Sequence, residues 1–507
     1  MNARVRVIKK KGRGARKGGA AGGSVGKSEA SNVGKSEGSG GKSGDKKEGR
    51  ATPTRQGSPA RQASPARRAA FALLGRVEED GAFAAPLLAG VAEELRADDR
   101  ALCYELVMGC LRRQLWLDRL MEIYAGRAAS ALDAPVRRAL RLGLYQLRFL
   151  SRIPPSAAVN ESVQLMHEAR LRSAAAFVNA VLRRATREPE RDPAEGINDE
   201  LERVSVETSH PVWLVERWTK AFGADEARAF AEANNAPAPV SFRLHPARAE
   251  SAEVLERLRA AGAKAVASKI APDAWRIEED GGAEGVALLR ALAGEGLIYM
   301  QDEASQLVAH VVGARAGELI LDACAAPGSK TTHMAALAGE SARIIAGDMY
   351  EHRLRLVREA AARQDLRNIL PIAYDAERAL PFADGAFARV LVDAPCTGTG
   401  TLRHNPEIRW RIRPEDFAEL AARQTRILAE ASRTVGAGGR LVYSTCSVER
   451  EENEAVVGQF LESHADFKQV SLAATAEAFL NVTGAARTWP HRDDTDGFFV
   501  AAFERAG

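Results

Sequence analysis

The sequence has few cysteines and no long apolar run. Its five cysteines form no C-x-x-C pair and no regular framework: Cys103, Cys110, Cys324, Cys396 and Cys446. This argues against both a zinc site and a disulfide scaffold. No stretch of about 18 apolar residues is present to span a bilayer, and no apolar signal segment follows the basic N-terminus. We therefore expect a cytoplasmic protein that binds no metal and contacts no membrane. A monomer is expected as well, although the sequence is silent on oligomeric state.

Phosphate-binding glycine loops are also missing. Three Gly-Lys-Ser triplets begin at Gly26, Gly34 and Gly41, but each lacks the first glycine that a nucleoside-triphosphate loop requires. They lie in a tract, residues 1–65, that carries 16 Lys or Arg and 4 Asp or Glu, whereas the rest of the 507 residues carries 55 and 63. We predict a disordered basic tail, because so little apolar area cannot form a core. It either holds RNA loosely through phosphates or serves only solubility.

Three apolar segments near the C-terminus each end in chemically active residues. They lead into Asp322, into Asp393 and Cys396, and into Thr445 and Cys446. Ligands of an open parallel sheet bind outside the carboxyl ends of its strands, so we expect these residues along one edge. The first segment lacks the G-x-G-x-x-G spacing that a dinucleotide pyrophosphate needs. A cofactor without phosphates is favoured, and S-adenosylmethionine fits.

Motifs at these positions resemble a known family. CAAPGSK (324–330), DAPCTGTG (393–400) and YSTCS (443–447), in this order and spacing, are similar to the Sun-type family of RNA cytosine-5 methyltransferases. Two departures are mild: Ser329 stands in place of the usual Gly, and Thr397 in place of a common Ser. The resemblance implies an all-α NusB-like RNA-binding domain (66–200), a small α/β RNA-recognition-like linker domain (201–300) and an α/β Rossmann-like methyltransferase domain (301–507).

The predicted helical domain has an apolar face and an arginine face. Arg137, Arg141 and Arg148 share a side that is either solvated or open to anions. The resemblance to NusB-type domains makes Arg183 and Arg184 candidates for RNA contact.

For two further features, packing in the protein interior is an alternative to a functional role. Cys103 and Cys110 lie seven residues apart on one predicted helix, and we predict that they are core residues. The segment 403–413, RHNPEIRWRIR, interleaves arginines with His404 and Trp410. It either binds RNA by phosphate contact and stacking, or packs through its apolar residues.

The cofactor site is predicted at the ends of successive strands. Asp348 follows the second strand and suits both ribose hydroxyls, while the resemblance assigns Asp375 to the adenine side and Asp393 to the cytosine edge or the cofactor. A turn at a helix start suits the methionine carboxylate. The turn residues expected there are Cys324, which also has a structural role, Ala325, Ala326, Pro327, Gly328, Ser329 and Lys330.

Methylation of cytosine at carbon-5 requires an attacking thiolate, because that carbon is a poor nucleophile until carbon-6 carries an adduct. Cys396 and Cys446 are both available, and spacing alone does not choose between them. The family resemblance assigns attack to Cys446 and product release to Cys396, with Asp393 beside the base.

The family resemblance implies methylation of carbon-5 of a cytosine in 16S ribosomal RNA, of the cytosine-967 class. The partner is the naked RNA or a small-subunit assembly intermediate, with the target base unstacked. The alternatives are the same chemistry on transfer RNA or another ribosomal RNA, and a non-catalytic RNA-binding or ribosome-assembly factor. The NusB-like domain disfavours the first alternative, since the ribosomal branch carries it. The presence of Cys396, Cys446, Asp348 and Asp393 disfavours the second.

Overall fold

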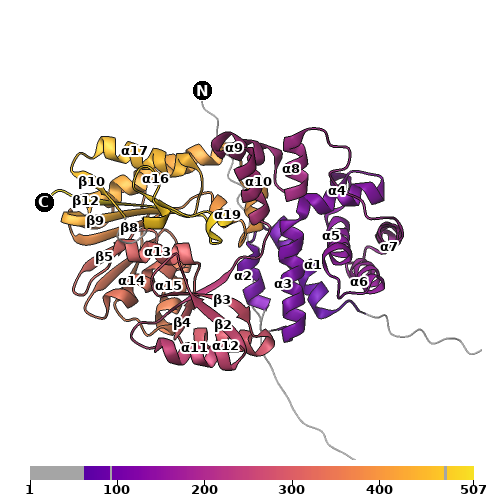
Figure 1. Cartoon of the computed structure of the whole chain (residues 1–507), viewed down its shortest axis with the longest axis horizontal. Helices are drawn as coiled ribbons and strands as arrows, with labels where there is room; N and C mark the ends of the chain where they lie inside the picture. The colour runs from indigo at the N-terminus through magenta and orange to yellow at the C-terminus, as the bar shows by residue number, and fades with distance from the viewer. Residues whose placement is uncertain (1–61, 92–93, 473–476) are drawn as a thin grey trace, which may run out of the picture. The chain divides into compact units, whose positions relative to one another are not determined.

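The computed structural model describes residues 62–91, 94–472 and 477–507 (Figure 1). The predicted tail, residues 1–65, lies almost entirely outside the described residues, so both of its suggested roles stay predictions. Among the residues that are described, no helix combines the length and the apolar composition needed to cross a membrane.

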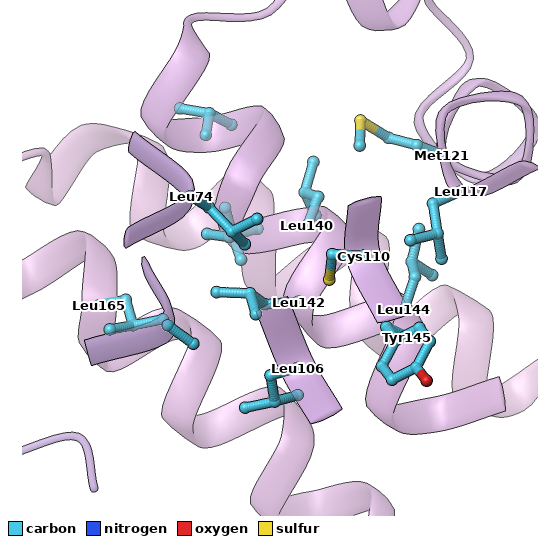
Figure 2. Close-up of a cluster of buried hydrophobic side chains, with 14 of the residues drawn as sticks. Leu74, Leu106, Cys110, Leu117, Met121, Leu140, Leu142, Leu144, Tyr145 and Leu165 are labelled. Carbon is cyan, nitrogen blue, oxygen red and sulfur yellow. The ribbon is translucent and has the colours of Figure 1, made fainter. Parts of the chain in front are cut away.

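Seven helices open the described chain: α1 (Pro65–Glu79), α2 (Ala84–Val91), α3 (Ala97–Arg112), α4 (Gln114–Ala125), α5 (Ala134–Phe149), α6 (Pro155–Glu168) and α7 (Arg172–Arg187). Apolar residues three and four positions apart give each helix one face to bury, and these faces form one core. Cys103 and Cys110 are each 1% exposed within it, and Figure 2 shows Cys110 among leucines. Burial raises the pKa of the Cys103 thiol to about 11 and that of Cys110 further. The prediction of core cysteines is confirmed.

The arginine face of α5 is neither solvated nor open to anions. Arg141 makes two hydrogen bonds to the Asp118 carboxylate, both 2.7 Å long. Arg137 pairs with Glu78 of α1, and Arg148 donates to groups of α4 and α7. The three side chains are only 10 to 19% exposed. Periodicity identified this face, but both predicted roles for it were wrong, because distant carboxylates and carbonyls occupy it.

The RNA contact predicted for Arg183 and Arg184 is not decided by their internal contacts. Arg184 pairs with Glu188 and donates to the Tyr124 carbonyl at 3.1 Å, while Arg183 donates to Asn179 of its own helix. Both arginines are exposed on α7. RNA contact at these two residues therefore stays a prediction.

Three helices lead from this domain into a small α/β unit: α8 (Glu200–Thr208), α9 (Val212–Phe222) and α10 (Ala224–Ala233). The unit contains β1 (Val240–Leu244), α11 (Ser251–Ala260), β2 (Ala263–Ala267), β3 (Ala274–Asp280), α12 (Gly282–Gly294) and β4 (Ile298–Met300). Its strands pair in the order β2-β3-β1-β4, and every pair is antiparallel. This split βαβ arrangement agrees with the predicted linker domain.

The C-terminal domain is built on an eight-stranded sheet with the order β10-β12-β9-β8-β5-β6-β7, in which β11 pairs with β12. Its strands are β5 (Leu319–Asp322), β6 (Arg343–Asp348), β7 (Ile369–Ala373), β8 (Phe387–Asp393), β9 (Val435–Thr445), β10 (Phe467–Val470), β11 (Ala486–Arg487) and β12 (Phe499–Arg505). Strands β9, β8, β5, β6 and β7 run parallel, and β12 is antiparallel to β9 and β10. The predicted mostly parallel, doubly wound sheet is confirmed.

Helices cover both faces of this sheet: α13 (Glu303–Val312), α14 (Ser329–Ala338), α15 (Glu351–Arg363), α16 (Pro414–Arg433) and α17 (Glu454–Ser463). The short α19 (Pro490–Asp493) lies instead against α10. Successive strand residues face opposite ways, so Ile320 packs in the core with α13 to α15, and Leu321 in the core with α16 and α17 (Figure 1). Because both faces are buried, β5 and β8 read as continuous apolar runs. This made them detectable in the sequence.

The segment 403–413 packs against the N-terminal helices. The Arg409 side chain is fully buried, and its guanidinium donates to carbonyls at the C-terminal ends of α3, α8 and α10 and to the Asn235 side chain at 2.8 Å. A cation suits this place, since helix ends leave carbonyls unpaired and carry partial negative charge. Arg409 is therefore not available for RNA contact. The packing alternative, predicted for Ile408 and Trp410, holds for Ile408, which packs against the core that contains Trp218 and Phe230.

Candidate active site

The carboxyl ends of four parallel strands meet at one edge of the sheet. The registers of β6, β5, β8 and β9 bring Asp348, Asp322, Asp393 and Thr445 to that edge. A cavity of about 270 Å³ opens there. Its lining includes the predicted site residues Cys324, Ala326, Asp348, Asp393, Cys396 and Cys446.

A tight turn joins β5 to α14 beside this cavity. Gly328 has a φ of +106°, and a Cβ at this position would lie 3.0 Å from the Val357 Cα, so only glycine fits without strain. Helix α14 starts at the next residue, and its first free N–H groups therefore lie at the turn. Several predicted cofactor residues shape the turn but do not themselves line the cavity: Ala325, Pro327, Gly328, Ser329 and Lys330.

Asp348 and Asp375 differ in their surroundings. Asp348 is 5% exposed and lines the cavity, where its Oδ1 accepts from the Tyr350 N–H at 3.1 Å and its Oδ2 lies 3.2 Å from Arg353. Asp375 does not line the cavity, whereas the two residues that follow it do. The structure thus brings Asp348, but not the Asp375 carboxylate, to the cavity wall.

Asp322 is a buried carboxyl to which the sequence gave no separate role. Its Oδ2 accepts from the Thr331 hydroxyl at 2.7 Å, which fixes α14 against the end of β5. Burial raises the pKa of Asp322 to about 7. Its position after an apolar strand was visible in the sequence, but its complete burial was not.

Lys330 reaches the centre of the site. Its Nζ donates to Asp393 Oδ2 at 2.8 Å, and the Ser444 hydroxyl donates to Asp393 Oδ1 at 2.8 Å. Burial alone would lower the pKa of Lys330, but Asp393, with a smaller contribution from Cys446, raises it overall. An ammonium therefore neutralises Asp393 and acts on Cys446 electrostatically.

The two predicted catalytic cysteines are neighbours. Their sulfurs lie 3.3 Å apart, although fifty residues separate them in the chain. Cys396 follows β8 and Cys446 follows β9, and the parallel pairing of these strands explains the approach. The hydrogen bond to Cys446, together with burial, raises the pKa of Cys396 well above its usual range.

A buried carboxylate holds the two cysteine segments together. Glu452 is fully buried and accepts hydrogen bonds from the N–H and hydroxyl of Thr397, the hydroxyl of Ser447 and the Gln424 amide. Thr397 and Ser447 directly follow Cys396 and Cys446 in the chain. Glu452 therefore acts as a positioning residue for both thiols. Nothing in its sequence context distinguishes it from its neighbour Glu451.

One further cluster lies outside the predicted site. Ligand atoms of Asp302, His404 and Asp496 come within 4.8 Å of one another. The Asp302 carboxylate already accepts hydrogen bonds from three N–H or O–H groups. Lys330 and Arg403 also act on Asp496, which disfavours a second cation. The expected absence of a metal stays a prediction.

Comparisons with known proteins match each of the three domains at least in part. The family model "16S rRNA methyltransferase RsmB/F" matches residues 309–504, a NusB family model matches residues 64–187, and a ferredoxin-like domain model of RsmF/B-like methyltransferases matches residues 210–283. The solved structure of PH0851 is 27% identical, with a TM-score of 0.74, and the similarity covers 88% of this chain and 100% of that one.

Curated bacterial relatives are similar over nearly their whole length. A probable ribosomal RNA small subunit methyltransferase B of Bacillus subtilis (strain 168) is 34% identical over 448 residues, which is 86% of this chain and 98% of the relative. A ribosomal RNA small subunit methyltransferase B of Pseudomonas syringae pv. tomato is 35% identical over 427 residues, or 82% and 92%. The predicted family and fold class are confirmed, while the exact domain limits stay predictions. The chain belongs to the ribosomal RNA small subunit methyltransferase B family.

Proposed function

We propose that this protein uses S-adenosylmethionine to methylate carbon-5 of a cytosine in 16S ribosomal RNA. Cys446 is the nucleophile, and Cys396 assists product release. The observation that supports this most directly is the pair of thiols, 3.3 Å apart, beside a cavity lined by Asp348 and Asp393. The relatives named for small-subunit RNA methylation support the RNA class.

The cavity suits S-adenosylmethionine in its polar groups. Asp348, at the end of β6, is placed to accept from ribose hydroxyls, and the N–H groups at the start of α14 suit a carboxylate. The chain has no glycine pattern for a pyrophosphate at this turn. When bound, the cofactor supplies an electrophilic methyl group. We keep Asp375 as a residue near the cofactor, because the two residues that follow it line the cavity although its own side chain does not.

The raised pKa of Cys396 favours attack by Cys446. Burial and the hydrogen bond between the two sulfurs raise the pKa of Cys396, which makes it the poorer nucleophile of the pair. Cys446 is also within electrostatic reach of the Lys330 ammonium. Asp393, held by Lys330 and Ser444, offers an acceptor to the amino edge of the cytosine. Attack of Cys446 on carbon-6 makes carbon-5 nucleophilic, and carbon-5 then takes the methyl group. Carbon-5 must next lose its proton to a base, the product-release role proposed for Cys396, and the Cys446–carbon-6 bond breaks to return the Cys446 thiolate.

A denaturing gel tests the assignment of the two cysteines. Wild type, Cys396→Ala and Cys446→Ala are each mixed with S-adenosylmethionine and naked 16S ribosomal RNA, and the RNA nucleosides are analysed by mass spectrometry. We expect 5-methylcytosine with wild type, and a protein–RNA adduct that accumulates only with Cys396→Ala. Accumulation only with Cys446→Ala would reverse the two roles. No methyl transfer to naked RNA, assembly intermediates or transfer RNA would overturn the function itself.

A further inference from the structure

A second cavity adjoins the two thiols. Its volume is about 710 Å³, and it shares Cys396, Cys446 and Arg423 with the smaller cofactor cavity. Because both cysteines line the two cavities, a cytosine can reach them from the larger one while the smaller one holds the cofactor. We call the larger cavity the substrate groove. The proposed function then requires the strand that carries the target base to pass through this groove.

One aromatic ring in the groove comes from the helical domain. Phe83 lies in the turn between α1 and α2, and 46% of its surface is exposed. Two carbonyls of this turn and of the end of α1 accept from Arg411 Nη2 at 2.7 and 3.0 Å. The Ala84 N–H donates to Glu407 at 2.7 Å. The catalytic domain therefore holds the Phe83 turn in place while the ring stays open to the groove.

Phe83 and Arg411 also contact each other. The Arg411 guanidinium carbon lies 5.0 Å from the centre of the Phe83 ring, within the range of a cation–π contact. An aromatic ring and a planar cation are the two groups on which unstacked bases of single-stranded RNA stack.

Charge in the groove favours stacking over phosphate binding. Three arginines and three carboxylates line it: Arg411, Arg423, Arg426, Glu377, Asp416 and Glu419. Arg423 and Arg426 both pair with Glu377 at 2.7 Å. The formal charge of the groove is therefore balanced, and an RNA strand gains little there from its phosphates alone.

We propose that Phe83 and Arg411 form a stacking platform for a base that flanks the target cytosine. This inference rests on the proposed function, because it requires a target base that leaves its stack to reach Cys446. Once that base has left, its neighbour loses a stacking partner. The platform replaces the lost partner, so the helical domain contributes to substrate binding inside the catalytic groove.

Steady-state methylation of 16S ribosomal RNA tests the platform with Phe83→Ala, Phe83→Trp and the control Tyr104→Ala. Tyr104 is a similarly exposed aromatic residue, 49%, that does not line the groove. We expect Phe83→Ala to raise the KM for RNA by roughly 5- to 100-fold, the usual worth of one base stack, with an unchanged KM for S-adenosylmethionine. Phe83→Trp should stay near wild type, and so should Tyr104→Ala. A Phe83→Ala KM for RNA that matches the Tyr104→Ala value would overturn the platform.

A second measurement identifies the stacked base. After the wild-type product has been mapped, short synthetic RNAs carry one abasic position on either side of the target. At one of these positions, the abasic RNA should bind wild type as weakly as the intact RNA binds Phe83→Ala. The same abasic RNA should bind Phe83→Ala no more weakly than the intact RNA does. If every abasic position weakened the binding of Phe83→Ala as much as it weakened the binding of wild type, the platform would be overturned. If wild type transfers no methyl group, the proposed function fails, while fluorescence anisotropy of labelled 16S RNA with wild type and Phe83→Ala still decides the platform.

Discussion

Glu452→Gln is the most direct test of how the two thiols are held together. The Glu452 carboxylate accepts from the hydroxyls of Thr397 and Ser447, each of which follows one cysteine. Glutamine keeps the shape but replaces one acceptor oxygen by an N–H donor and removes the charge. Losing the charge-assisted part of two hydrogen bonds costs about 2 kcal/mol, or about 30-fold in rate. Burial raises the pKa of Glu452, so removing the buried charge should offset part of what the weakened hydrogen bonds cost in overall stability.

The assay is methyl transfer to small-subunit RNA, with adduct lifetime as a second readout. We expect kcat to fall about 30-fold and the adduct to persist, while the KM for S-adenosylmethionine stays unchanged because Asp348 is untouched. Glu451→Gln removes an equal charge one residue away, where the side chain is 47% exposed and pairs with Arg217. If Glu452→Gln kept wild-type kcat, or if Glu451→Gln lost as much, Glu452 would not position the thiols.

Three other substitutions have defined outcomes. The raised pKa of Asp322, about 7 against an ordinary 3.8, gives stability that is full below pH 3.8 and lost as the pH rises through 7. Across that interval the unfolding free energy of wild type should therefore fall by up to about 4 kcal/mol relative to that of Asp322→Asn in urea titrations. Asp348→Asn should weaken S-adenosylmethionine binding about tenfold or more in calorimetry and leave the KM for RNA unchanged. Arg409→Met leaves buried helix-end carbonyls unpaired and should cost about 1 to 3 kcal/mol; an unchanged unfolding midpoint would contradict this account of the residue.

The sequence predicted those parts of the site that follow from local pattern. Strands β5 and β8 are buried on both faces, so their apolar runs showed where each strand ends. Asp393 and Cys446 lie at strand ends, and the parallel pairing of β8 with β9 then brings Cys396 near Cys446. No knowledge of distant contacts was needed for that step.

The parts that escaped prediction depend on contacts between distant residues. Arg141 looked like a surface residue until Asp118 supplied its carboxylate. Glu451 and Glu452 are the same residue type at adjacent positions, yet Glu452 is fully buried and Glu451 is about half exposed. Periodicity shows which way a side chain points, but it does not show which distant side chain comes to meet it.

The segment 403–413 connects the helical domain to the catalytic domain beside the groove. Arg409 joins the C-terminal ends of three helices to the catalytic domain, and Arg411 holds the turn that carries Phe83. The segment begins three residues after the loop that contains Cys396 and ends before α16, whose Arg423 lines both cavities. A shift of the helical domain would therefore move the Phe83 turn and the wall of the groove together. The substrate binding proposed for the Phe83 turn and the thiol chemistry proposed at the strand ends are thus connected by this one short segment.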